Sequence, residues 1–559
     1  MFLLVPLAAA TTWVVNKDGT GDFGQVQSAI DVARAGDIIE VGPGTYRGAL
    51  VVRSRILTLR SRDGSGTTIL DGAGEAELLR LESADVLLEG FTLVNDGGAG
   101  MVTVDRSEVE ARDLVFSGLL GAFSMENGAA SFEDCAFVGG VAEMGAGIRA
   151  DAGTVNVVAS SFEGNAANYG ADVYLGPGAR LVLDSVASSG AVATEAGGSV
   201  YMSMLADAVV SECSFEGSSA VHGGAIALDG ANLTVEGTSF VGSDAERGGA
   251  VYAARGTVAS LGSSFEANMA TRGGAVAIFS GGLDDVSSRF VANAASDQGG
   301  AVYLSSSRLG MAGSRLEANV APYTPALRML DGEAGTLSGV VLVGNVGSQP
   351  VWGDAWPWTV EGLSSEGHHT DAVAWFAGSG ELSGVSTSDG GLVFDGDFVV
   401  HDSTVTGAVY GVYVYQGAVS LLRSQVSADN TALGSYDGDL RTSAVTVARG
   451  GVTAAGGAIV LAHTTVLHGT ILGLGGVVEG HSVIATGPIE GDVTLAYSDA
   501  TISPWPGNGN ITPTRSSSSR TPTCACGAPA PASTPATPRP PTPTAAGRTW
   551  GPGADQTSW

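Results

Sequence analysis

Lysine is almost missing from this chain of 559 residues, and basic residues as a whole are scarce. Lys17 is the only lysine, and 26 basic residues stand against 57 acidic ones, which gives a formal net charge of −31. A nucleic-acid partner requires a basic surface to neutralise phosphates, so this composition excludes that class of partner. Aromatic residues are also few, at 6% of the chain.

Cysteine is rare as well, with four residues in the whole chain. Cys135 and Cys213 occupy the same place in an internal repeat, each two residues before a phenylalanine. Three coils of about 4.8 Å would separate them by about 14 Å, which is beyond the reach of a disulfide bond. We therefore predict two buried thiols and no disulfide framework.

Long apolar runs are missing after the first ten residues. The most apolar later stretch, 456–478, contains many glycines together with His463 and His468, so we expect no transmembrane anchor. Residues 1–10, MFLLVPLAAA, end in Ala-x-Ala but lack a basic beginning. Two interpretations stay open for 1–10: a signal peptide with a truncated first region, or a first β-strand of the fold.

The other end of the chain lacks core-forming residues. From Thr512 onwards there is no Val, Ile, Leu, Phe, Tyr or Met, and Pro, Ala, Thr and Ser dominate. Such a composition cannot bury a core. We interpret 506–559 as a disordered tail, either the product of a frameshift in GC-rich coding sequence or a linker to a partner domain.

Glycine, in contrast, is abundant, with 84 residues, and it follows a repeat. A fixed period of about 25 residues predicts a solenoid. Four phenylalanines recur with spacings of 25, 25 and 25: Phe215, Phe240, Phe265 and Phe290. Four glycine pairs begin with spacings of 25, 25 and 26: at Gly223, Gly248, Gly273 and Gly299.

Short alternating segments in each repeat predict β-strands. Stacked coils would turn each aliphatic position into a column that buries a continuous core. The asparagines of the F-x-x-N segments, such as Asn165, Asn268 and Asn293, suit turns and can bond to the neighbouring coil. We predict an all-β fold: a single-stranded right-handed parallel β-helix over 37–505, with a loop insertion near 350–375. Roughly 19 coils at about 4.8 Å each would make it about 90 Å long.

The segment 11–36 has a different pattern. Val26, Ala29, Ile30 and Ala33 fall on one face of a helix, and Gly36 follows as a stop signal. The first coil of a solenoid would otherwise expose apolar core and an open strand edge. We predict an N-terminal strand and capping helix over 11–36.

Two sets of motifs resemble known families. The run DGTGDF, VQSAIDVA and GPGTYRG resembles the N-terminal cap of pectin-lyase-like right-handed β-helices. The GGA[IV] and FxxN repeats are similar to those of chlamydial polymorphic outer-membrane proteins. The resemblance covers 11–345 well and 346–505 more loosely. It implies a β-helix at the cell surface or outside the cell, and it says little about activity because this fold hosts many functions.

Catalytic signatures of the enzymes with this fold are incomplete. Of the polygalacturonase-like motifs only Asp284-Asp285 is present, and a solvated turn is the alternative interpretation. His368, His369 and Asp371 have metal-ligand types, but adjacent histidines in a loop rarely converge on one ion, so we predict no metal site. The acidic composition is compatible with Ca²⁺, although no motif supports it, and no other cofactor is expected.

Two columns are candidates for binding. Polar residues precede the glycine pairs, with a solvated turn as the alternative: His222, Arg247, Arg272 and Gln298. Tyrosines occupy the outward face of the next strand, with ordinary β-surface as the alternative: Tyr174, Tyr201, Tyr252 and Tyr303. From Tyr201 on they recur every second coil, about 9.6 Å apart, which is close to the repeat of an extended disaccharide. Trp352, Trp356 and Trp358 form another cluster, with a hinge or packing role as the alternative.

The leading hypothesis is a secreted or cell-surface protein that acts as a non-catalytic adhesin or glycan-binding scaffold. Its partner would be an extended polysaccharide or a host or cell-surface glycan, and we expect a monomer. Tyr201, Tyr252 and Tyr303 would contact the polymer, and Arg247 and Arg272 would meet its acidic groups. A divergent polysaccharide lyase, hydrolase or esterase is the alternative, and a structural spacer is a third possibility.

Overall fold

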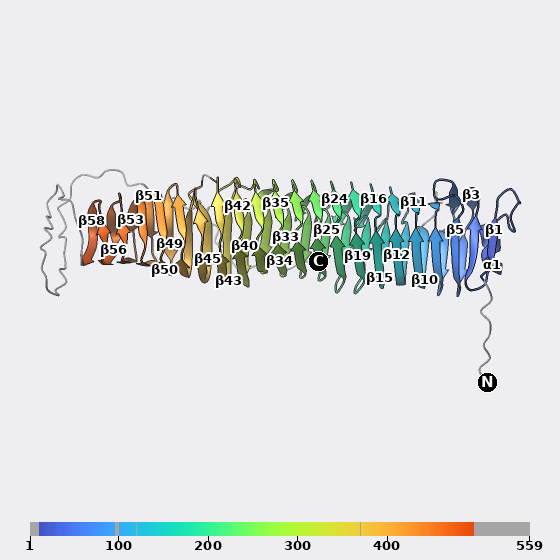
Figure 1. Cartoon of the computed structure of the whole chain (residues 1–559), viewed down its shortest axis with the longest axis horizontal. Coiled ribbons are helices and arrows are strands. Elements are labelled where there is room, and N and C mark those ends of the chain that lie inside the picture. Colours follow the sequence, from blue (N-terminus) through green and yellow to red (C-terminus); the bar gives the residue numbers. More distant parts are fainter. Residues whose placement is uncertain (1–9, 96–99, 119, 369, 497–559) are drawn as a thin grey trace, which may run out of the picture.

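The computed structural model describes residues 10–95, 100–118, 120–368 and 370–496. From β1 (Thr12–Val15) to β58 (Ile489–Ala496) the chain forms one right-handed parallel β-helix of about 18 turns of about 24 residues each. The turns stack into a rod (Figure 1). The predicted fold class is confirmed. The tail at 506–559 and all but the last residue of the stretch 1–10 lie outside the described residues.

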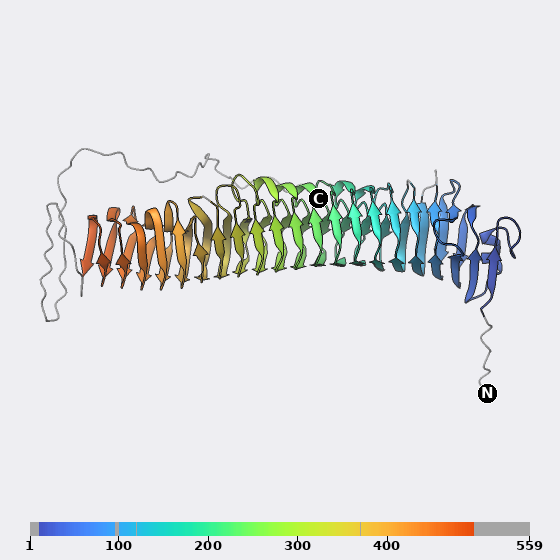
Figure 2. The ribbon, with the colours of Figure 1, turned by 45° about the horizontal axis from the view of Figure 1, so that its top comes forward.

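Each turn contributes three short strands, and each strand pairs in parallel with its counterpart one turn later. Figure 2 shows these strands side by side along the rod. The phenylalanine column includes β24 (Ser214–Glu216), β27 (Ser239–Val241), β31 (Ser264–Glu266) and β35 (Arg289–Val291). The column that follows the glycine pairs, called the aliphatic column, includes β18 (Val173–Leu175), β22 (Val200–Met202), β25 (Ile226–Asp229), β29 (Val251–Ala254), β33 (Val276–Phe279), β37 (Val302–Ser305) and β40 (Leu327–Gly332).

The phenylalanines stack inside the rod, as predicted. Ring centroids from Phe215 to Phe240, Phe265 and Phe290 are 5.1, 4.9 and 4.8 Å apart, and neighbouring rings lie within 6° of parallel. All four rings are buried. Because the four successive coils from Phe215 to Phe290 present the same residue at the same place, this part of the core is a stack of like rings.

The two cysteines of the repeat are also where the sequence places them. Cys135 and Cys213 are buried and free. Burial raises the pKa of the Cys135 thiol to about 12 and that of Cys213 to about 11. Both are small core residues that stay protonated at neutral pH.

Asparagines form a buried ladder along the rod. The Nδ2 of Asn268 donates to the Oδ1 of Asn293 at 3.0 Å, and the same contact joins Asn293 to Asn319 and Asn319 to Asn345. Each Nδ2 also donates to a backbone oxygen, and the Oδ1 atoms of Asn293, Asn319 and Asn345 also accept from the backbone N–H of the preceding asparagine. The ladder ends where Asn345 N donates to Nδ1 of His368 at 3.1 Å. Satisfied on every side, these amides carry little desolvation penalty.

The two glycines of each pair are required for different reasons. Gly248 has a φ of 63°, and a Cβ there would collide with the oxygen of Val251. Gly249 lies so close to the next coil that its Cβ would collide with the oxygen of Gly274. Thus the first glycine supplies a left-handed turn and the second supplies room for the neighbouring backbone.

A fourth strand column lies between the phenylalanine column and the glycine pairs. Isolated bridges continue it from Val141 to Val346. The longer turns have enough residues to form this additional strand. Its strands are β17 (Ala166–Tyr169), β21 (Val192–Ala196), β28 (Asp244–Arg247), β32 (Met269–Arg272) and β36 (Ala294–Gln298).

The predicted loop insertion near 350–375 is wrong. The strands β43 (Val351–Glu361), β44 (Ser364–Glu366) and β45 (Ala372–Ser383) continue the columns there. Bonded partners one turn apart are 25 or 26 residues apart in the asparagine ladder but only 18 to 22 apart near the C-terminal end. The turns shorten after the fourth column ends, so the period used to find coils no longer applies.

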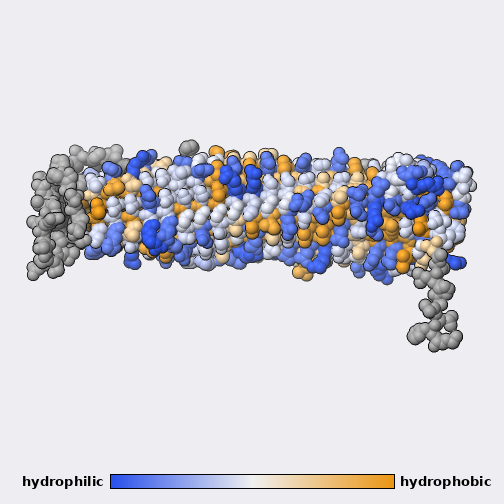
Figure 3. Space-filling view, in the orientation of Figure 1, coloured by the Kyte–Doolittle hydropathy of each residue, from blue (hydrophilic) through white to orange (hydrophobic). Residues whose placement is uncertain are grey.

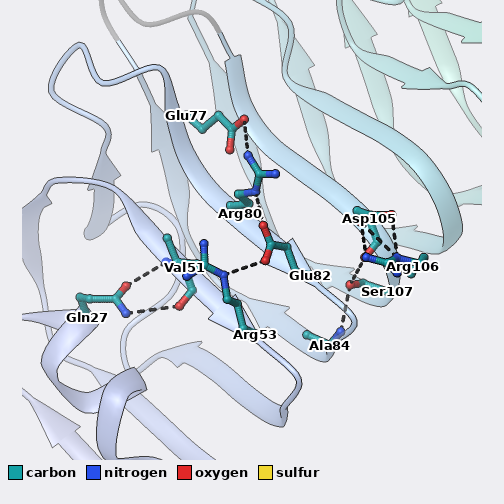
Figure 4. A network of polar contacts seen from close by, with 10 residues as sticks. All are labelled: Gln27, Val51, Arg53, Glu77, Arg80, Glu82, Ala84, Asp105, Arg106 and Ser107. Carbon is teal, nitrogen blue, oxygen red and sulfur yellow. Dashed lines mark hydrogen bonds and ion pairs between the residues drawn. The ribbon is translucent and has the colours of Figure 1, made fainter.

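The helix α1 (Val26–Val32) lies at the N-terminal end of the rod and buries Val26, Ala29 and Ile30. Gln27 bonds to both backbone groups of Val51 in β4 (Leu50–Arg53), at 2.8 and 3.3 Å, and Arg53 continues the network to Glu82 (Figure 4). The Gln27 side chain therefore satisfies backbone hydrogen-bonding groups of β4, which pairs with a strand of the following turn but with none of a preceding turn. That α1 caps the rod stays a prediction.

One carboxyl is fully enclosed. Asp172 is 1% exposed and accepts hydrogen bonds from Nδ2 of Asn165 at 2.8 Å and Oγ of Ser188 at 2.5 Å. Burial raises its pKa to about 6, against the lowering effect of the hydrogen bonds from Ser188, Asn165 and Ser199. At neutral pH the folded chain therefore holds a buried charge without a basic partner within hydrogen-bond reach.

We predict that Asp172→Asn raises stability at pH 8 and that this gain disappears as the pH falls to 4. The folded pKa of about 6 lies above the ordinary value of 3.8, so the buried charge lowers the stability of the wild type above pH 6 and no longer does so below about pH 4, where the carboxyl is protonated. This difference in pKa corresponds to about 3 kcal/mol of unfolding free energy. Melting temperatures at pH 4, 6 and 8 measure the difference, with the exposed Asp63→Asn as control. A gain that is equal at every pH would contradict the assignment.

Candidate functional site

The predicted tyrosines belong to one column on the outward side of the aliphatic column, and we call it the outer column. Its register is unbroken over eleven strands, through β43, β45, β47 (Gly391–His401) and β49 (Tyr410–Gln416). In order its residues are Tyr174, Tyr201, Ala227, Tyr252, Ala277, Tyr303, Arg328, Trp352, Trp375, Val393 and Tyr413.

The middle of the outer column is covered, which corrects the prediction of an open tyrosine ladder. Tyr303 is 3% exposed, and its ring lies 5.5 Å from that of Phe279. Phe279 also lies 5.7 Å from the ring of Tyr252. Phe279, which sequence analysis missed, fills the space beside the small residue Ala277. A polymer cannot stack on Tyr303.

The polar residues before the glycine pairs provide the cover. His222 stacks on Tyr252 with centroids 4.9 Å apart, and the Cζ of Arg247 lies 5.4 Å from the centroid of Phe279. Burial, and then the charge of Arg247, lowers the pKa of His222. These side chains close the gap between the fourth column and the aliphatic column.

Arg272 takes the same position one coil later. Its Cζ lies 5.7 Å from the Tyr303 centroid, and its Nε donates to Asp297 at 3.0 Å. Asp297 therefore offsets part of the charge of Arg272, and a contact of Arg272 with an anionic ligand stays a prediction. At the N-terminal end, Tyr174 and Tyr201 stay partly exposed, with centroids 5.6 Å apart.

Asp284 and Asp285 do not form an acid–base pair. They lie on opposite faces of β34 (Gly282–Val286). Asp284 faces outward and forms a bidentate pair with Arg308 at 2.7 and 2.6 Å. Asp285 is buried and accepts from Ser314, and burial raises its pKa. Adjacent strand residues point to opposite sides of a sheet, so the pair cannot act on one substrate.

His368 is a structural residue at the end of the asparagine ladder. It is buried, and burial lowers its pKa. Asp371 is exposed, and His369 lies outside the described residues. In the part of the chain that the structure describes, no group of three or more His, Cys, Asp or Glu side chains is arranged to hold a metal ion.

The three tryptophans that the sequence singled out divide between two faces of β43. Trp358 is buried in the core against Phe376 at 5.1 Å, which is the packing role. Trp352 faces outward, and the guanidinium of Arg328 lies on it, with Cζ 3.3 Å from the ring centroid. Trp356 is 63% exposed, so its indole is available to a ligand.

Carboxylates lie in the same region, in the column next to the outer column. Asp354 on β43 and Asp395 on β47 are both paired to the same small residue, Ala377. Two rungs of about 4.8 Å separate them by about 9.6 Å. Burial raises the pKa of both, and the charges of Asp331 and Asp395 raise that of Asp354 further.

Further aromatic rings lie on the two strands that flank the strand of Asp395. The centroids of Trp375 and Tyr415 are 5.8 Å apart, although two rungs separate their strands. Tyr415 stacks on Tyr436 at 5.4 Å, and Tyr436 is 45% exposed. We call this region the aromatic–carboxylate surface, and its residues are Arg328, Trp352, Asp354, Trp356, Trp375, Asp395, Tyr415 and Tyr436.

Sequence reasoning missed most of this surface because it treated 350–375 as a loop. The signal was present as alternation: in WGDAWPW the residues Trp352, Asp354 and Trp356 are two apart and share one strand face. Asp395 has the same outward position two strands on. A strand interpretation of this segment would have placed them together.

A hollow lies near the N-terminal end, where Asp85, Glu108 and Glu110 face outward around Thr58 and Leu87. Its lining contains no aromatic side chain. Without a ring to stack on a sugar, it lacks the feature that makes the aromatic–carboxylate surface a candidate. On the face seen in Figure 3, apolar side chains occur in patches between polar ones along the whole rod.

Comparison with known proteins gives likeness in fold. No protein-family model matches the chain, and no curated protein matches it either. Among solved structures, carrot pectin methylesterase is 12% identical over 46% of this chain and 84% of its own, with a TM-score of 0.26. Pectate lyase Pel9A is 14% identical over 47% and 76%, with a TM-score of 0.24. The PL6 family alginate lyase AlyGC is 9% identical over 88% and 100%, with a TM-score of 0.26.

At these identities and TM-scores the likenesses carry no argument about activity. Within the described ranges, no helix combines the length and apolar character needed to cross a membrane.

We predict that Tyr303→Ala destabilises the rod by about 3 kcal/mol, because it removes a buried ring that packs between Phe279 and Arg272. Tyr436→Ala, which removes a ring that is 45% exposed, should cost much less. Thermal unfolding followed by circular dichroism measures both. Equal melting temperatures for wild type and Tyr303→Ala would show that the ring is not packed in this way.

Proposed function

We propose that this protein is a secreted or cell-surface glycan-binding β-helix protein that holds an extended polysaccharide on the aromatic–carboxylate surface. The carrying observation is a set of exposed or partly exposed rings that follow one another along the rod, Trp356, Trp375, Tyr415 and Tyr436, with Asp395 on the rung between Trp375 and Tyr415. Aromatic rings offer flat amphipathic faces to sugars. The repeats similar to those of chlamydial outer-membrane proteins support a location at the cell surface or outside the cell.

The direction of the surface also supports an extended ligand. All of its residues except Tyr436 lie on strands β40, β43, β45, β47 and β49, which are stacked along the rod at about 4.8 Å per rung. A polymer that follows the rod axis would meet a ring or a carboxyl at nearly every rung. Four to six contacts of about 1 kcal/mol each would give dissociation constants between about 1 mM and several tens of micromolar.

The geometry supports a second candidate, polysaccharide hydrolysis. The backbones of Asp354 and Asp395 are two rungs, or about 9.6 Å, apart, and carboxyls in inverting glycosidases are separated by roughly 6.5–9.5 Å. Burial raises the pKa of Asp395, which is the direction that a general acid requires. Release of reducing ends that Asp395→Asn abolishes would favour this candidate over binding alone.

We predict that Trp375→Ala weakens polysaccharide binding tenfold or more and leaves the fold intact, because its ring is partly exposed. Affinity electrophoresis and calorimetry against a panel of plant, algal and bacterial polysaccharides measure the effect. Tyr174→Ala is the matched control, since Tyr174 belongs to the same column eight rungs away. If Tyr174→Ala weakens binding and Trp375→Ala does not, the ligand lies elsewhere on the rod.

A further inference from the structure

The aromatic–carboxylate surface is negatively charged. Asp331 and Asp397 are exposed at its edges, and Asp354 and Asp395 lie within it. Asp397 Oδ1 accepts only a backbone bond, from Ala418 N at 2.9 Å, which leaves its charge in place. A ligand on these rungs is therefore surrounded by carboxylates.

Arg328 offsets only part of this charge. Against the raising effects of burial and of Asp331 and Asp395, its positive charge lowers the pKa of Asp354. Its guanidinium lies on the Trp352 ring, and among the described residues it makes no ion pair with a carboxylate. One arginine against Asp331, Asp354, Asp395 and Asp397 leaves the surface with a net negative charge.

The basic residues in the middle of the rod do not offset the negative charge of the surface. Arg247 lies over Phe279, and Arg272 is paired with Asp297, three or more rungs from Trp375. At about 4.8 Å per rung that distance exceeds a Debye length of about 8–10 Å at physiological ionic strength. Their charges are screened before they reach the surface.

We propose that the aromatic–carboxylate surface selects polysaccharides without carboxylate groups and excludes uronans, with Asp354 and Asp395 as the specificity-determining residues. This rests on the proposed function of glycan binding. A uronic acid that stacks on Trp375 would bring its carboxylate near Asp354 and Asp395, which are both partly buried. A neutral sugar in the same place meets no repulsion, and its hydroxyl groups can donate to both carboxyls.

The repulsion follows from elementary electrostatics. Like charges a few ångströms apart in a partly dehydrated site interact far more strongly than in bulk water. Burial is the main cause that raises the pKa of Asp354, and the like charges of Asp331 and Asp395 raise it further. A carboxylate on the ligand would add to the electrostatic repulsion among these aspartates.

The test compares polymer pairs that share one backbone, a neutral glucan, galactan or mannan and its C6-carboxylated form. The full chain should bind at least one neutral polymer at least tenfold more tightly than its carboxylated counterpart. Asp354→Asn combined with Asp395→Asn should reduce that ratio to about threefold or less, mainly by tightening binding to the carboxylated polymer. Raising NaCl from 0.05 to 1 M should reduce the ratio for the wild type, because the Debye length shortens to about 3 Å.

The control pair is Asp207→Asn with Asp284→Asn. It changes the net charge equally, on outward residues that face Arg180 and Arg308 elsewhere on the rod. This variant should keep the wild-type ratio. If it lowers the ratio as much as the test pair, general charge rather than the two aspartates sets selectivity, and the assignment is overturned.

The remaining outcomes separate the two proposals. If no polymer binds, the proposed function fails and the selectivity fails with it. If carboxylated polymers bind as tightly as neutral ones and Trp375→Ala weakens both, the glycan site stands and the selectivity is overturned. If the ratio is high but unchanged by the double asparagine variant, Asp354 and Asp395 do not determine it.

Discussion

The backbone hydrogen bonds between successive turns set every other property of this rod. They hold equivalent residues of neighbouring turns one rung apart, so any residue type that recurs becomes a continuous column. Gly249 shows how close this stacking is, since a single Cβ there would meet the backbone of the next turn. Phenylalanine, asparagine and tyrosine each gain a neighbour of their own kind through the same constraint.

Columns that repeat in the sequence were predictable from it. The spacing of Phe215, Phe240, Phe265 and Phe290 predicts their stack, and the asparagines predict a ladder. Each of these contacts lies within one column, where sequence period alone determines the neighbour. The same logic correctly placed the tyrosines in one column.

Contacts between columns were not predictable in this way. Tyr303 is buried because Arg272 and Phe279 come from different positions of other turns, and no period relates those positions. The aromatic–carboxylate surface was missed for a related reason. Where the fourth column ends, each turn loses several residues, and the changed period hides strands such as β43 from a search based on 25 residues. The candidate site therefore lies where the repeat is least regular.

The regularity of the other turns has a consequence for how such a protein can change. A turn of the repeat contacts only the turn before it and the turn after it, and both present the same set of residues. Insertion or deletion of one whole turn between Phe215 and Phe290 would preserve the phenylalanine stack and the backbone pairing, and would shift the C-terminal surface by about 4.8 Å. The repeat thus acts as a spacer of adjustable length, which sets how far the surface stands from the N-terminal end without altering its chemistry.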